Sequence, residues 1–202
     1  MRKRNLWQLL SLFLLTGIIY ACTKDNDEDS SSKETLPPEV AEAKAWFESQ
    51  TQVKDGLLPW KPVAGGKETV LTPDWRWVFS SEDSNYKMVE VHVEEAEPLN
   101  CVTAECSEKY RQTGDKRYLA SMIRLVIRTH KDTKVKDGFI MLAFPDLSYL
   151  EAHKDNPLNG VSYLKRPSDF SGMVIFYDMN SEFVNGWIYQ EGVAYPFTMA
   201  TE

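Results

Sequence analysis

The sequence predicts an α+β domain in which one N-terminal amphipathic helix packs on a curved antiparallel β-sheet. The first observation is a stretch of helical periodicity at the start of the folded region. The second is a series of later segments in which apolar and polar residues alternate with a period of two, which is typical of half-buried strands. The third is the lack of helical patterns between those segments, which argues against a parallel α/β arrangement.

The predicted helix covers about residues 38–50, and Pro38 suits its first turn. Val40, Ala43 and Phe47 fall at helical spacing and form an apolar stripe along it. A single helix can bury such a stripe only against a sheet. We therefore expect the stripe in the core of the domain and not in the groove of a partner.

The connection that follows, residues 51–72, is predicted to be irregular but packed across the domain. A long structureless loop with an exposed tryptophan would be unusual. The connection contains five glycine and proline residues, which interrupt helices and strands: Gly56, Pro59, Pro62, Gly65 and Gly66.

Strands are predicted wherever the period is two. In the clearest of them, residues 86–94, three valines share one face and the other face holds Glu90, His92 and Glu94. We expect a half-exposed strand with that polar face in solvent. The predicted strands cover residues 75–79, 86–94, 119–129, 139–144, 173–177, 183–190 and 193–199.

The last three of these segments predict a meander that closes the domain. Pro196 makes the final segment an edge strand, because proline has no N–H to donate to a neighbour. One helix followed by several antiparallel strands favours a cystatin-like arrangement as the first choice. A helix-capped β-sandwich is the second choice.

The N-terminus predicts export from the cytoplasm. Residues 1–21 combine three basic residues, an apolar run over residues 9–19 and the small residue Ala21 before Cys22, which is the pattern of a secretory signal. The run is too short for a transmembrane helix, which needs about 20 apolar residues.

The segment Ile19-Tyr20-Ala21-Cys22 resembles a bacterial lipobox, with an aliphatic residue three positions before the cysteine and a small one directly before it. The resemblance implies that the sulfur of Cys22 receives a diacylglycerol and that the chain is cut before this residue. Several acyl chains, at about 0.8 kcal/mol per buried methylene, would anchor the protein stably in a membrane. The alternative is an ordinary secreted protein with a cysteine near its cleavage site.

Residues 22–36 are predicted to be the lipidated cysteine and a disordered acidic linker, followed by a single globular domain over residues 37–202. Lys24–Asp29 resembles the acidic export signal of Bacteroidetes-type lipoproteins that reach the outer face of the outer membrane. With the Ala43–Phe47, Phe170–Gly172 and Tyr177–Gly192 segments, the chain is similar to the globular part of such lipoproteins. The resemblance implies a lipid-anchored, cell-surface location, with a periplasm-facing outer-membrane lipoprotein as the alternative.

The charge and the cysteines limit the partners. Removing residues 1–21, with three basic and no acidic residues, takes the formal net charge from −7 to −10, which disfavours nucleic acid as a partner.

Cys101 and Cys106 are expected to form a small-loop disulfide in an oxidising compartment. A zinc site needs four ligands, and His92 is the only histidine near the two cysteines. We therefore expect neither a metal nor a cofactor.

No catalytic motif is present, and His92, His130 and His153 do not fall at a spacing that defines a site. We expect a binding protein and not an enzyme, although a hydrolase assembled from distant residues stays an alternative. A protein-interaction or protease-inhibitor module is a further alternative.

The expected ligand is a glycan or an envelope protein, because tryptophan rings offer flat faces to either. The candidate ligand-binding aromatics are Trp60, Trp75 and Trp77. Trp60 is the best candidate for an exposed ring, because it lies in the irregular connection. Trp75 and Trp77 share one strand face if residues 75–79 are extended.

Overall fold

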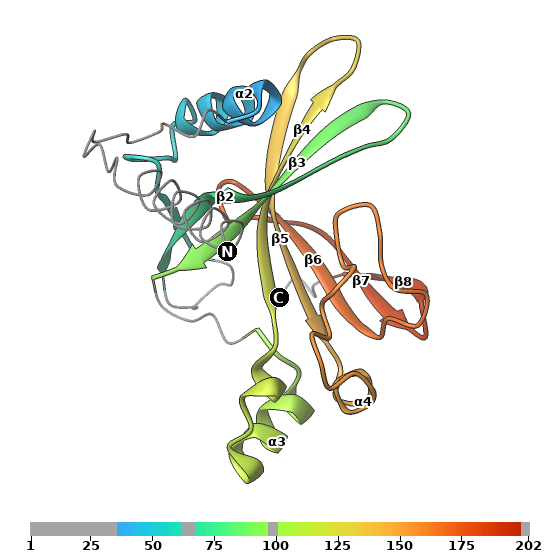
Figure 1. Cartoon of the computed structure of the whole chain (residues 1–202). Coiled ribbons are helices and arrows are strands. Elements are labelled where there is room, and N and C mark those ends of the chain that lie inside the picture. The colour runs from blue at the N-terminus through green and yellow to red at the C-terminus, as the bar shows by residue number, and fades with distance from the viewer. Residues whose placement is uncertain (1–35, 62–67, 97–100, 199–202) are drawn as a thin grey trace, which may run out of the picture. The chain divides into compact units, whose positions relative to one another are not determined.

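The computed structural model describes residues 36–61, 68–96 and 101–198. Within these residues, eight antiparallel strands form one sheet and follow each other across it in chain order. The sheet is strongly twisted and curled, as Figure 1 shows for β2 to β8. The strands are β1 (Leu58–Trp60), β2 (Thr69–Glu82), β3 (Tyr86–Glu95), β4 (Met122–His130), β5 (Lys136–Pro145), β6 (Gly172–Asp178), β7 (Phe183–Gln190) and β8 (Val193–Phe197).

The described residues also form three α-helices and one 3-10 helix, where the sequence predicts a single helix. The missed helix α3 has few apolar residues and buries only Cys106, so it lacks the apolar stripe that reveals a helix. Its ends carry local signals, since the Thr103 hydroxyl accepts from the Cys106 N–H and Gly114 ends the helix at φ 69°. The helices are α2 (Pro38–Glu48), α3 (Ala104–Thr113), η1 (Lys116–Leu119) and α4 (Leu147–Ala152).

One face of the sheet, called the α2 face, carries the larger apolar core. Helix α2 contributes Val40, Ala43 and Phe47 to this core, and all three are buried. The buried strand residues of this cluster alternate along each strand and so share one face of the sheet. They include Val91 on β3, Leu125 on β4, Leu142 on β5 and Ile175 on β6.

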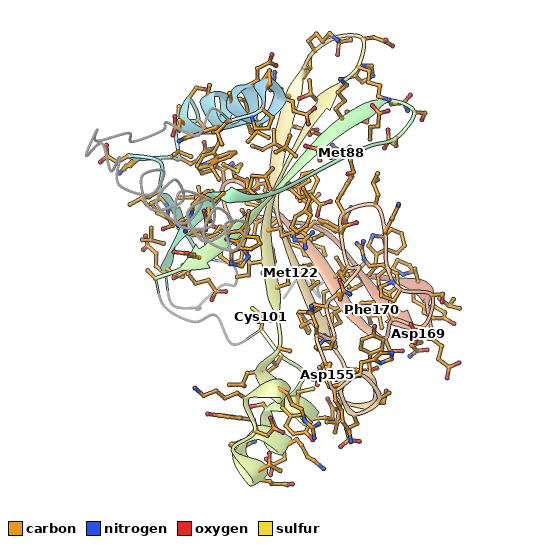
Figure 2. The ribbon with its side chains drawn as sticks, viewed as in Figure 1. Met88, Cys101, Met122, Asp155, Asp169 and Phe170 are labelled. Carbon is orange, nitrogen blue, oxygen red and sulfur yellow. The ribbon has the colours of Figure 1, made fainter. Side chains whose placement is uncertain are left out.

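The opposite face, called the strap face, is covered by residues 153–171, the segment between α4 and β6. We call this segment the strap. Val161 and Phe170 of the strap are buried against Met141 of β5 and Val174 of β6. Figure 2 labels Phe170 beside Asp169, over the C-terminal strands. The smaller core therefore lies between strands and an irregular segment.

The strap corrects one prediction about β3. The polar face of this strand was expected in solvent, but the Glu90 side chain is only 1% exposed. The strap lies over this residue, and the backbone N–H of Tyr163 donates to its Oε1 at 3.0 Å. An irregular covering segment has no periodicity, so the sequence pattern of β3 alone could not reveal it.

Two further predictions concern the ends of the sheet. The prediction that the Pro196 strand lies at an edge is confirmed, because β8 is last in the strand order. The connection expected to be irregular over residues 51–72 contains β1 and the start of β2. These two segments pair, with Trp60 opposite Thr69.

Candidate ligand-binding site

The strap face contains a cavity of about 450 Å³, which we call the strap cavity. This volume lies within the range of about 300 to 1,000 Å³ typical of small-molecule sites. Its walls come from β4 to β7, the strap and the turn before β3. Five aromatic side chains line it: Phe139, Tyr163, Phe176, Trp187 and Tyr189.

Strand alternation explains why these rings meet. Asn185, Trp187 and Tyr189 are alternate residues of β7 and therefore share one face of it. The register places Trp187 opposite Val174 and Asn185 opposite Phe176, so these residues all belong to the strap face. Trp187 is 36% exposed, which leaves part of its ring open to a ligand.

The strap contributes one ring to an aromatic cluster in the cavity wall. The ring centroid of Tyr163 lies 5.3 Å from that of Phe139 and 5.9 Å from that of Phe176. The centroids of Phe139 and Phe176 are 5.6 Å apart, with the rings nearly perpendicular. Such edge-to-face contacts stabilise a fixed ring arrangement, so this wall is formed before any ligand binds.

Arg128 lines the cavity with its charge already paired. Its Nε donates to Asp137 Oδ1 at 2.8 Å, its Nη2 donates to Asp137 Oδ2 at 2.5 Å, and its Nη1 donates to the Tyr163 hydroxyl at 3.1 Å. The hydrogen bond to the Asp137 carboxylate raises the pKa of Arg128. Arg128 therefore positions Tyr163 and leaves little charge for a ligand.

Arg166 lines the same cavity in a different state. Its Nη1 donates to backbone carbonyls of the strap, those of Ser162 and, at 2.8 Å, Lys165. Its Nε is buried and has no hydrogen-bond partner among the described residues. Burial lowers the pKa of Arg166, because desolvation disfavours the charged form. The guanidinium also lies over the Tyr189 ring, 5.6 Å from its centroid.

A buried ion pair holds the strap beside this cavity. Arg124 Nη1 donates to Glu90 Oε2 at 2.8 Å, and the Arg124 guanidinium lies 4.6 Å from the centroid of the Phe79 ring. The other Glu90 oxygen accepts from Tyr163 of the strap. One carboxylate thus joins β4, β3 and the strap.

A second cavity of about 620 Å³ is also lined by the strap. Leu164 lines both cavities, so the strap contributes to the walls of both. Glu90 and Arg124 line the second cavity, together with serine hydroxyls from β2. Its walls have fewer aromatic rings than those of the strap cavity.

No family model, curated protein or solved structure matches this chain. Assignment of a function therefore depends on the geometry of the two cavities and on the sequence. No helix among residues 36–61, 68–96 and 101–198 is both long and apolar enough to cross a membrane.

The three tryptophans singled out in the sequence do not line either cavity. The expectation that Trp60 is exposed is wrong: it is 1% exposed and packs edge-on against Tyr177 at 5.4 Å. Trp75 packs on Phe47 at 6.0 Å, whereas Trp77 is 64% exposed. The register of β2 shifts between Asp74 and Val78, which separates the environments of these two rings.

The expected disulfide between Cys101 and Cys106 is absent, and both thiols are free. Cys106 is buried with Tyr118 and Leu150 in a small cluster, while Cys101 packs against the α2-face core. Burial raises the pKa of both thiols, that of Cys101 to about 11. Both are therefore protonated and weakly reactive at neutral pH. Cys22, the predicted lipidation site, lies outside the described residues.

The histidines lie apart from the two cavities. His153 Nε2 is 3.1 Å from Asp169 Oδ2, and its ring stacks on Tyr149 with centroids 4.0 Å apart. His130 Nδ1 accepts from backbone N–H groups of its own turn. These contacts give His130 and His153 local structural roles.

The residues that build the site were only partly visible in the sequence. The alternation of Asn185, Trp187 and Tyr189 could have indicated a shared face, but it does not show which face is covered. Arg166 lies in an irregular segment and carries no periodic signal. Glu90 and Arg124 each lie on the polar side of a predicted strand, which was the only available sign of an ion pair across strands.

Proposed function

We propose that this protein is a lipid-anchored, non-catalytic binding protein that holds a glycan in the strap cavity. The observation that carries the proposal is the cavity wall, which combines flat aromatic rings with a few polar groups. Sites for small molecules have this composition, because apolar walls supply contact area and polar groups fix orientation. A sugar ring offers a C–H face to such rings and hydroxyls to such polar groups.

The spacing on β7 supports a carbohydrate ligand. Trp187 and Tyr189 are two residues apart on one face, which separates them by about 7 Å along the strand. The Trp187 ring therefore provides a platform for a sugar, next to the Tyr189 ring with the Arg166 guanidinium over it. Asn185 lines the same cavity and supplies hydrogen-bonding groups.

Binding without conversion is favoured by the groups that line the strap cavity. Neither a histidine nor a cysteine is among its described lining residues. The side chains of Arg128 and Asp83 are engaged within the protein, the first by Asp137 and the second by backbone N–H groups of Asn85 and Tyr86. These groups therefore suit recognition better than proton transfer.

The proposed location is supported by the sequence. The lipobox ending at Cys22 and the acidic segment after it support attachment to the outer membrane, at the cell surface. A random coil of the length of residues 23–35 would span roughly 20 Å, which limits the domain to ligands near the envelope. Acyl labelling should be lost in Cys22→Ser. Protease treatment of intact cells should remove the domain, and a protected domain would contradict the surface location.

The finer fold assignment is also part of the proposal. A single sheet with α2 on one face is what a cystatin-like arrangement would require, whereas a helix-capped sandwich needs two sheets. We therefore prefer the cystatin-like arrangement. The strap and α3 would be additions to it.

A glycan array with the full chain and Trp187→Ala tests the function. We expect binding to a subset of glycans and a loss of about tenfold or more in the variant, because a ring in the cavity contributes contact area directly. Trp77→Ala is the matched control, since this ring is exposed and lies outside both cavities. No glycan signal, together with capture of an envelope protein, would support a protein-interaction module instead.

A further inference from the structure

Arg166 differs from the other arginines of the strap face in its partners. Arg124 pairs with Glu90, and Arg128 pairs with Asp137. No carboxylate lies within ion-pair distance of Arg166 in the part of the chain that the structure describes. The acceptors of its Nη1 are all backbone carbonyls of the strap, which are neutral.

The charges around Arg166 do not cancel. Its charge interacts favourably with Glu90 and unfavourably with Arg124. Glu90 is already paired with Arg124. Arg166, Arg124 and Glu90 together therefore carry one net positive charge. Asp83 adds one negative charge to the cavity wall; its carboxylate accepts from the N–H groups of Asn85 and Tyr86, and the nearby Lys131 and Arg128 pair with Glu82 and Asp137.

The carbonyl contacts hold the Arg166 guanidinium in a fixed place. Several acceptors on Nη1 fix the plane of the group, while Nε has no partner. Arg166 is half-buried. A charge partly withdrawn from water without a counter-ion is costly, and an anion beside it offsets that cost. Because Nη1 is engaged by strap carbonyls and Nε is buried, Nη2 is the donor left for a carboxylate or sulfate, which a guanidinium binds through charge-assisted hydrogen bonds.

We infer that the ligand of the strap cavity is an acidic glycan, whose carboxylate or sulfate group pairs with Arg166 while a sugar ring stacks on Trp187. This inference rests on the proposed function and names the class of glycan. The formal net charge of the chain is −7, so most of the protein repels such a ligand. A local positive site in an acidic protein therefore selects where the anion binds.

Calorimetric titration of the full chain, purified in detergent, tests the inference with three probes of equal length. These are a hexuronate oligosaccharide, a sulfated oligosaccharide and a neutral hexose oligosaccharide. We expect at least one acidic probe to bind about tenfold or more tightly than the neutral one, as for a hydrogen bond to a charged group. The two acidic probes distinguish carboxylate from sulfate as the source of the charge.

Arg166→Gln should abolish the preference for the acidic probe, and Arg111→Gln, on the exposed side of α3, should retain it. Should Arg166→Gln fail to fold, the salt dependence of the unmodified chain gives the answer. Affinity for the acidic probe should fall with ionic strength, and affinity for the neutral probe should not.

Equal affinities for acidic and neutral probes would overturn the inference and leave the proposed function intact, provided Trp187→Ala weakens both. An acidic preference that survives in Arg166→Gln would also overturn it. If none of the glycan probes binds, the proposed function itself fails, and the inference fails with it.

Discussion

The two faces of the sheet are both buried, yet they are built from different chemistry. On the α2 face, a regular helix covers strand residues that are apolar, such as Val91 and Leu125. On the strap face, an irregular segment covers a mixture of aromatic rings and charges, including Glu90 and Arg124. The difference supports the proposal that the strap face recognises a ligand, while the α2 face stabilises the fold.

Energetics support this division. Apolar burial stabilises a protein by about 25 cal/mol per Å² of surface removed from water. A buried ion pair contributes little net stability, because the cost of desolvating two charges offsets their attraction. The charges of the strap face are therefore poorly explained by stability alone, and a role in positioning the strap and its cavity explains them better.

The largest expected effect is on the α2 face. Phe47 is fully buried and packs on Trp75, so Phe47→Ala should lower the free energy of unfolding by about 3 to 5 kcal/mol. Urea denaturation of the variant measures this loss. Trp77→Ala is the control and should change stability by less than about 0.5 kcal/mol. A small effect at Phe47 would show that α2 is not an essential part of the core.

The next effect is on the strap face. Glu90→Leu leaves Arg124 buried without a counter-ion and removes the acceptor of the Tyr163 N–H, at a cost of about 3 kcal/mol. The double variant Glu90→Leu with Arg124→Met should recover most of this stability, since an apolar pair can replace a buried ion pair. Denaturation of both variants gives the comparison. A ligand titration should also show weaker binding in the double variant, because the strap has lost the hydrogen bond between the Tyr163 N–H and Glu90.

If the double variant is as unstable as the single one and binds ligand normally, the ion pair has no separate role in holding the strap. The two faces would then differ in composition only.

A smaller effect is expected where the strap meets the β7–β8 turn. Gly192 has φ 78°, and its N–H donates to the Phe170 carbonyl at 2.9 Å. A Cβ there would lie 1.9 Å from the Ser168 carbonyl oxygen, so Gly192→Ala must push the strap away. We expect a loss of about 1 to 3 kcal/mol. Gly114→Ala is a matched control with a similar φ and open space around it; an equal loss there would mean that the strap contact adds nothing.

The smallest effect concerns pH. The hydrogen bond from Arg76 lowers the pKa of Asp74 from 3.8 to about 2. A folded-state pKa below the unfolded value stabilises the protein above about pH 4, and this contribution is lost as the pH falls from about 4 to 2. Asp74→Asn should flatten this part of the stability profile, measured by thermal unfolding. An unchanged acid limb would show that Asp74 does not contribute to it.

The sequence predicted the regular parts of the molecule better than the irregular ones. Period-two alternation located most of the strands, and Pro196 correctly marked an edge strand. The strap has no period, so neither its place over Glu90 nor the burial of that residue could be predicted. Trp60 was placed wrongly because its strand has only three residues, too few for a pattern.

The candidate site was largely hidden for the same reason. Trp187 and Tyr189 lie on a predicted strand, but choosing between its two faces requires knowledge of what covers them. Arg166 becomes informative only when its neighbours are known, because its lack of a carboxylate partner is a property of the folded chain. The free thiols of Cys101 and Cys106 likewise depend on packing that their spacing does not show.

An NMR titration that follows the tryptophan indole N–H signals of the full chain tests most directly whether the strap face, and not the α2 face, binds the ligand. The probe is the hexuronate or the sulfated oligosaccharide, whichever binds more tightly in the calorimetric titration. Trp187 reports on the strap face, and Trp60, buried in the core, reports on the α2 face. If the strap face binds the ligand, we expect a saturable shift at Trp187 and at the amides of residues 163–166, with Trp60 unchanged. Shifts at Trp60 and along α2, with none at Trp187, would contradict binding at the strap face.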